Sequence, residues 1–170
     1  MTSNNGQGRV ALRLGSVIWV AALFLGISQA GILRPQPAAA NEQILSHPAH
    51  QLGLLGYDAV AFFADEGAVL GSADHELIYR GLVWRFVHEA NKRAFAADPA
   101  RYLPAYGGFD ARKAASGIAA ASDPRVYLVL GQRLFLFASP ASRYAFLLNA
   151  ERTIVQADNR WPELLRTLAP

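Results

Sequence analysis

The 170-residue chain contains no cysteine, and its one methionine is Met1. A chain without cysteine forms no disulfide and carries no lipid on an N-terminal cysteine, so its fold must depend on its hydrophobic core. Sites for soft metals such as Cu(I), which need thiolate or thioether ligands, are excluded for the same reason. Only a harder site built from histidine and carboxylate side chains remains open to this sequence.

Catalytic motifs are also lacking. The sequence has no nucleophile elbow, no glycine-rich phosphate loop followed by lysine, and no pair of carboxylates at a spacing that indicates acid/base chemistry. We therefore predict that the protein is not an enzyme.

The charge balance gives no support to a nucleic-acid partner. The whole chain has 16 Lys and Arg against 13 Asp and Glu, a formal net charge of +3. Three of the basic residues, Arg9, Arg13 and Arg34, precede Asn41, and the rest of the chain has 13 charges of each sign. No basic stripe with interleaved aromatic residues is present, so we predict no nucleic-acid partner.

The first 40 residues have the pattern of an export signal. Arg9 and Arg13 precede an apolar run over 14–33, which is followed by two prolines and by three alanines at 38–40. This order predicts a signal peptide over 1–40, cleaved after Ala40, and a periplasmic or extracellular location. An uncleaved anchor is the alternative, because the run is nearly long enough to span a bilayer; the membrane would be contacted only through this segment.

Length and composition suit one domain after the leader. With 52% hydrophobic residues, the chain is long enough for one core and too short for two ordinary domains. We predict a linker over 41–53, a folded domain over 54–161 and a C-terminal tail over 162–170.

Alternation of apolar and polar residues over 77–86 predicts a β-hairpin that turns at Arg80-Gly81. A helix over 89–97 should follow, ending before Pro99, with Phe95 on the face of Trp84. The pattern repeats in the second half, with strands over 126–130 and 134–137. Ser139-Pro140 then begins a second helix, which should run to about residue 149.

Aromatic positions relate the two units. Phe86 and Phe137 differ by 51 positions, and so do Phe95 and Phe146. Duplication and shared local rules for joining a hairpin to a helix both explain this spacing. The predicted fold class is α+β: a small single domain of two β-hairpin-plus-helix units packed on one core, closed by a C-terminal helical segment anchored at Trp161.

Two aspartates follow glycine-containing turns. Asp58 follows Gly56 and should cap the apolar segment after it, and Asp110 follows the turn over 106–109 and should cap a short helix over 111–115. Since asparagine is as good a cap as aspartate, capping alone predicts that Asp110→Asn is nearly neutral.

Several of these segments together resemble the YHS-domain proteins of bacteria, in particular their exported single-domain branch. The resemblance covers roughly Leu55 to Trp161. It is carried by Gly-Tyr-Asp-Ala-Val-Ala-Phe-Phe at 56–63, by Gly71-Ser72 and by Tyr79-Arg80-Gly81 with the aromatic residues after it. Its most specific part is Asp-Pro-x-x-Tyr-x-Pro-x-Tyr-Gly-Gly at 98–108.

YHS domains accompany heavy-metal-transporting ATPases and some oxygenases and are thought to bind metal. In the usual pattern a cysteine follows the Tyr-Gly-Gly-aromatic turn, and here that position is Asp110. The resemblance therefore implies a non-catalytic binding or accessory module without a cofactor, whose partner is a small ligand or a protein. The residues that it implies for binding are Tyr57, Asp58, Tyr106, Phe109 and Asp110.

The alternative is a periplasmic protein that binds a divalent metal ion, Zn²⁺ or Cu²⁺. Its candidate ligands are His75, His88, Asp58 and Asp110, where His88 occupies a helix-start position that is serine in many YHS relatives. Each of these residues also has an ordinary structural role open to it, as a cap or as a solvated side chain.

Overall fold

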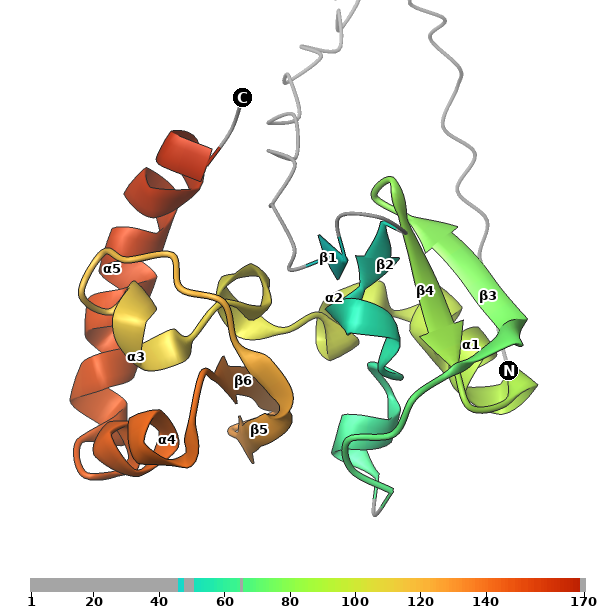
Figure 1. The fold of residues 1–170 in the computed structure, drawn as a ribbon, viewed down its shortest axis with the longest axis horizontal. Helices are drawn as coiled ribbons and strands as arrows, with labels where there is room; N and C mark the ends of the chain where they lie inside the picture. Colours follow the sequence, from blue (N-terminus) through green and yellow to red (C-terminus); the bar gives the residue numbers. More distant parts are fainter. Residues whose placement is uncertain (1–45, 48–50, 65, 169–170) are drawn as a thin grey trace, which may run out of the picture. The chain divides into compact units, whose positions relative to one another are not determined.

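The computed structural model describes residues 46–47, 51–64 and 66–168, and all of them belong to one compact unit. The predicted leader lies outside the described residues. Within them, no helix is both long and apolar enough to cross a membrane. The chain combines helices with two small sheets, which confirms the α+β class (Figure 1).

The elements follow one another in this order: β1 (Ser46–His47), β2 (Leu52–Gly53), the 3₁₀ turns η1 (Leu54–Gly56) and η2 (Ala61–Phe63), β3 (Ser72–Tyr79), β4 (Leu82–Phe86), α1 (Glu89–Ala97), α2 (Pro99–Tyr102), the 3₁₀ turn η3 (Ala105–Gly108), α3 (Ala111–Ala114), β5 (Asp123–Leu130), β6 (Arg133–Phe137), α4 (Pro140–Leu147) and α5 (Ala150–Leu168).

The first hairpin is confirmed. Strands β3 and β4 pair antiparallel around Arg80 and Gly81, both of which have positive φ. The sheet order is β1-β2-β4-β3, with β2 parallel to β4 through Leu52 and Val83. The prediction of a linker over 41–53 is therefore wrong for the described residues 46–47 and 52–53, because their backbones pair in this sheet.

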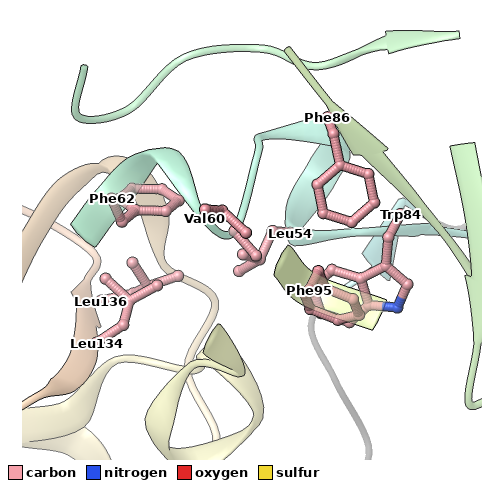
Figure 2. Packing of buried hydrophobic residues seen from close by; sticks show 9 residues of the cluster. Leu54, Val60, Phe62, Trp84, Phe86, Phe95, Leu134 and Leu136 are labelled. Atoms are coloured by element: carbon pink, nitrogen blue, oxygen red, sulfur yellow. The ribbon is translucent and has the colours of Figure 1, made fainter. Parts of the chain in front are cut away.

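Helix α1 has the predicted bounds, and Phe95 lies among the aromatic residues of the hairpin as expected. Its ring centroid is 4.9 Å from that of Trp84 and 5.3 Å from that of Phe86 (Figure 2). His88 is the N-cap, and its Nδ1 accepts a hydrogen bond from the backbone N–H of Asn91 at 3.3 Å.

The predicted C-terminal helical region is present. Helix α4 ends at Leu147, two residues before the expected end. Helix α5 runs from Ala150 to Leu168, so residues 162–168 of the predicted tail are part of that helical region. Leu164 explains the continuation, because it is buried in the same cluster as Phe146 and Ala157.

The buried side chains form two clusters, so the prediction of one core is wrong. Strand β6 separates them: Leu134 and Leu136 pack with Trp84 and its neighbours, whereas Phe135 and Phe137 pack with the second cluster. Successive side chains of a strand point to opposite faces, and both faces of β6 are covered.

Backbone geometry extends the relation between the two units. Each hairpin has a register shift in its strand pairing. In the first hairpin the shift lies between the pairs Ser72↔Phe86 and Glu76↔Arg85. In the second hairpin it lies between the pairs Asp123↔Phe137 and Tyr127↔Leu136. Each pair is shifted by 51 positions. We call residues 52–97 the first repeat and residues 104–147 the second repeat.

The match continues upstream of the hairpins. Leu52 pairs parallel with Val83, and Pro104 forms a parallel bridge with Leu134. Three successive residues then have positive φ in each repeat: 50°, 56° and 89° at positions 54–56, and 55°, 58° and 84° at 106–108. Local rules for joining a hairpin to a helix do not account for this shared turn.

Candidate functional site

Asp58 lies at the centre of the first repeat and is fully buried. Its Oδ1 accepts hydrogen bonds from the backbone N–H groups of Val60 at 2.8 Å and Ala61 at 3.3 Å. Its Oδ2 accepts from the backbone N–H of Val87 at 2.8 Å and from Nδ2 of Asn91 at 2.7 Å. The predicted cap is confirmed, and the same carboxylate also joins the turn to the start of α1.

Asp110 is fully buried at the equivalent place in the second repeat. Its Oδ1 accepts from the backbone N–H of Lys113 at 2.9 Å, which confirms the predicted cap of α3. Its Oδ2 accepts from the backbone N–H of Ala138 at 2.7 Å. Val87 and Ala138 are 51 positions apart and each follows the last residue of a hairpin, so both carboxylates hold the same junction.

The second oxygen changes the expectation for Asp110→Asn. An asparagine side chain offers one acceptor and two donors, whereas both oxygens of Asp110 face N–H groups. The substituted amide nitrogen would lie against the N–H of Ala138 or Lys113 and leave a buried donor unsatisfied. The prediction that this substitution is nearly neutral, made from capping alone, is therefore replaced by a predicted loss of stability.

The other residues implied for binding belong, in the part of the chain that the structure describes, to the packing of the two clusters. Tyr57 is half-buried and packs against the first cluster. Tyr106 is only 3% exposed and belongs to the second cluster, and the ring of Phe109 lies 6.2 Å from that of Trp161. Together with the two aspartates, these aromatic residues are parts of the packing of the two repeats.

Sequence reasoning missed a polar cluster on the second repeat. The Tyr106 hydroxyl donates a hydrogen bond to Oδ1 of Asp158 at 2.9 Å. Arg133 donates to both oxygens of the same carboxylate, from Nη2 at 2.8 Å and Nη1 at 3.1 Å. No sequence motif links these residues, because Asp158 is brought to β6 only by the packing of α5.

The protonation equilibria in this cluster follow from its contacts. Burial, followed by the hydrogen bond to Asp158, raises the pKa of Tyr106 well above its ordinary value. The hydrogen bonds from Arg133 lower the pKa of Asp158, and those same bonds raise the pKa of Arg133. The three groups therefore form a neutral phenol beside a bidentate ion pair at neutral pH.

The candidate metal ligands are not brought together. His75 Nδ1 lies 3.6 Å from a carboxylate oxygen of Glu89, and His88 Nε2 lies 3.8 Å from one of Glu66. Asp58 and Asp110 direct their oxygens to backbone and amide donors. Among the residues that the structure describes, no three His, Cys, Asp or Glu side chains are arranged to hold a metal ion.

A surface groove of about 350 Å³ lies elsewhere, between α3, α4 and the beginning of α5. It is lined by polar side chains that include Arg112, Asn149 and Arg152. A second depression of about 280 Å³ is lined by Ser116, Gly117 and the last turns of α5. Neither is lined by a residue that the sequence singled out for binding.

Comparison with models of protein families, with curated proteins and with solved structures finds no match to this chain. The fold and site define the class of the protein in physical terms: an α+β domain of two repeats, each braced by one buried aspartate. The YHS resemblance rests on the sequence segments at 56–63 and 98–108.

Proposed function

We propose that this chain is an exported YHS-domain protein that acts as a non-catalytic binding or accessory module. The proposal is supported mainly by the hydrogen bonds of the two buried aspartates. All the carboxylate oxygens of Asp58 and Asp110 accept hydrogen bonds from groups of the protein itself, at 2.7 to 3.3 Å. These acids stabilise the fold instead of facing a substrate.

A general acid, base or nucleophile must come within hydrogen-bond distance of its substrate. The most deeply buried polar residues, Asp58 and Asp110, are enclosed by backbone, and Tyr106 is tied to Asp158. What the domain offers to other molecules is the surface of two repeats that are held together by these internal hydrogen bonds, which supports a binding role.

Metal retention tests this proposal against its alternative. The purified protein is equilibrated with Zn²⁺ or Cu²⁺, desalted and assayed for bound metal. We expect no stoichiometric retention, because the candidate ligands lie in separate contacts. One retained equivalent that is lost in His75→Gln, or in His88→Ser, would overturn the proposal; serine keeps the N-cap of α1, as Ser139 does for α4.

The export part of the proposal has its own test. The form of the protein recovered outside the cytoplasm should begin at or near Asn41, because the leader has the order of a cleaved signal. N-terminal sequencing that gives Met1 or Thr2 would reject cleavage and favour an anchored protein.

A further inference from the structure

The groove between α3, α4 and α5 has a positive lining. Six polar residues line it: Arg112, Ser116, Asn149, Arg152, Thr153 and Gln156. No carboxylate is found among the described residues that form its walls. The surrounding half of the chain is also basic: residues 106–170 carry eight Lys and Arg and five Asp and Glu, whereas residues 41–105 carry five and eight. An excess of one sign around a groove attracts ligands of the other sign.

Arg112 is the unusual member of this lining. Its Nε is buried, yet finds no hydrogen-bond acceptor among the described residues. Buried N–H donors in native proteins almost always have an acceptor, and a charged donor without one is costly. The other arginines of the second repeat have acceptors: Arg133 pairs with Asp158, Arg125 with Asp123, and Arg143 donates to the carbonyl of Tyr127.

Arg152 lies on the other wall, on the first turns of α5, and no described side chain forms an ion pair with it either. Two arginines without carboxylate partners among the described residues therefore line one groove. The planar guanidinium donates two parallel hydrogen bonds to a carboxylate or phosphate group. A volume of about 350 Å³ is that of a small-molecule site and exceeds what a single ion needs.

We propose that this groove binds a small organic anion through a phosphate or carboxylate group held between Arg112 and Arg152. Asn149 and Gln156 supply amide groups for the rest of the ligand. This inference rests on the proposed binding role and gives it a ligand class. Metal retention through His75 would overturn the proposed function and leave the groove untouched, whereas failure to bind anions would overturn the groove alone.

The test is a ¹H–¹⁵N NMR titration of the purified protein at constant ionic strength, with inorganic phosphate, phenyl phosphate and succinate as separate probes. We expect saturable shifts confined to residues 112–116 and 149–156. Tighter binding of phenyl phosphate than of succinate would identify a phosphate ester as the ligand class. Tighter binding of succinate would identify a carboxylate.

Substitutions then distinguish specific binding in the groove from nonspecific electrostatic attraction of anions to the protein surface. Arg152→Gln should weaken binding of the better probe about tenfold, because a charge-assisted hydrogen-bonded pair is lost. Arg112→Lys keeps the charge and removes the planar set of guanidinium donors, so it should also weaken binding. Arg166→Gln, the same charge change at the far end of α5, is the control and should change affinity less than about twofold. Non-saturating shifts, or equal losses in Arg152→Gln and Arg166→Gln, would overturn the proposal.

Discussion

The two repeats have the same backbone pattern, but some of the side chains at equivalent positions differ. One such difference concerns a pair of positions, a small residue and an aromatic residue. In the first repeat Gly53 faces the indole of Trp84, and a Cβ at Gly53 would lie 2.8 Å from two of the ring carbons. The equivalent residues of the second repeat are Ala105 and Phe135, which belong to the second cluster. A phenyl ring is smaller than an indole, so we expect the methyl group of the alanine to be tolerated at this place in the second repeat.

A second difference between the repeats is the residue at the first position of the shared turn, and it follows from which element packs against that turn. Leu54 of the first repeat is buried in a cluster that includes Leu134 and Leu136 of β6 (Figure 2). Its counterpart in the second repeat is Tyr106, whose ring lies 5.9 Å from Trp161 of α5 and whose hydroxyl reaches Asp158. The first repeat is covered by apolar residues of a strand, and the second by an amphipathic helix that supplies a polar partner.

The third difference concerns the buried carboxylates. Asn91 donates to Asp58, whereas the equivalent residue of the second repeat is Ser142, whose buried hydroxyl has no partner among the described residues. Serine is shorter than asparagine and contributes no bond to Asp110. The backbone bonds that brace the junction are therefore common to both repeats, and the side-chain bond is not.

The largest expected effect tests whether the repeats contribute equally to stability. Phe95 and Phe146 occupy equivalent helix positions and are both fully buried. Truncation of either to alanine should cost about 3–5 kcal/mol of unfolding free energy, because each deletion leaves a large cavity. Urea denaturation measures both losses. A loss below roughly 1 kcal/mol for Phe146→Ala would show that the second cluster is not a core of comparable weight.

The Gly53/Trp84 pair allows a double-mutant cycle. Gly53→Ala should cost about 1–3 kcal/mol, because its methyl group overlaps the indole. In a Trp84→Phe background, which reproduces the pair found in the second repeat, most of this cost should disappear. The coupling energy measured by denaturant unfolding should therefore be favourable and about 0.5–3 kcal/mol. Additive losses would contradict the compensation between the two positions.

The Asn91/Ser142 difference predicts unequal effects of the same substitution. Asn91→Ala removes a 2.7 Å hydrogen bond to a buried carboxylate and should cost about 1–2 kcal/mol. Ser142→Ala removes a buried hydroxyl that has no partner among the described residues, so it should leave stability unchanged or raise it. Thermal unfolding of the two variants distinguishes them. An equal loss in both would mean that Ser142 also braces Asp110.

The smallest expected effect is the pH dependence of the Arg133–Asp158 pair, which only the second repeat has. The folded protein lowers the pKa of Asp158, so the stability it contributes is present above the unfolded pKa near 4 and is lost as pH falls through the folded value. Both side chains are 40% or more exposed, which limits the contribution to about 0.5–1 kcal/mol. The stability difference between the wild type and Asp158→Asn should therefore shrink below about pH 4. A constant difference down to pH 2 would contradict the ion pair.

Sequence patterns anticipated the parts of the fold that depend on neighbouring residues. The turn at Arg80-Gly81, the helix over 89–97 and the caps at Asp110 and Ser139 follow from local periodicity and capping chemistry, and all are present. Nothing local indicates that β6 is covered on both faces, because this depends on long-range packing.

In the candidate site, too, local sequence predicted some features, and others depend on contacts between distant residues. The aspartates were found because glycine-containing turns precede them, but their second oxygens bind backbone groups 28 and 29 positions away. The Tyr106–Asp158 bond spans 52 positions and has no sequence signal. The unpartnered Nε of Arg112 was equally invisible, since it depends on which helices surround that side chain.

Each buried aspartate uses both of its carboxylate oxygens to hold its repeat together. The direct measurement is the unfolding free energy of Asp58→Asn and Asp110→Asn, each compared with the wild type in urea. We predict a loss of about 1–3 kcal/mol in both, because each amide leaves at least one buried N–H unsatisfied. Unchanged stability in either variant would contradict the claim and leave that aspartate as an ordinary cap.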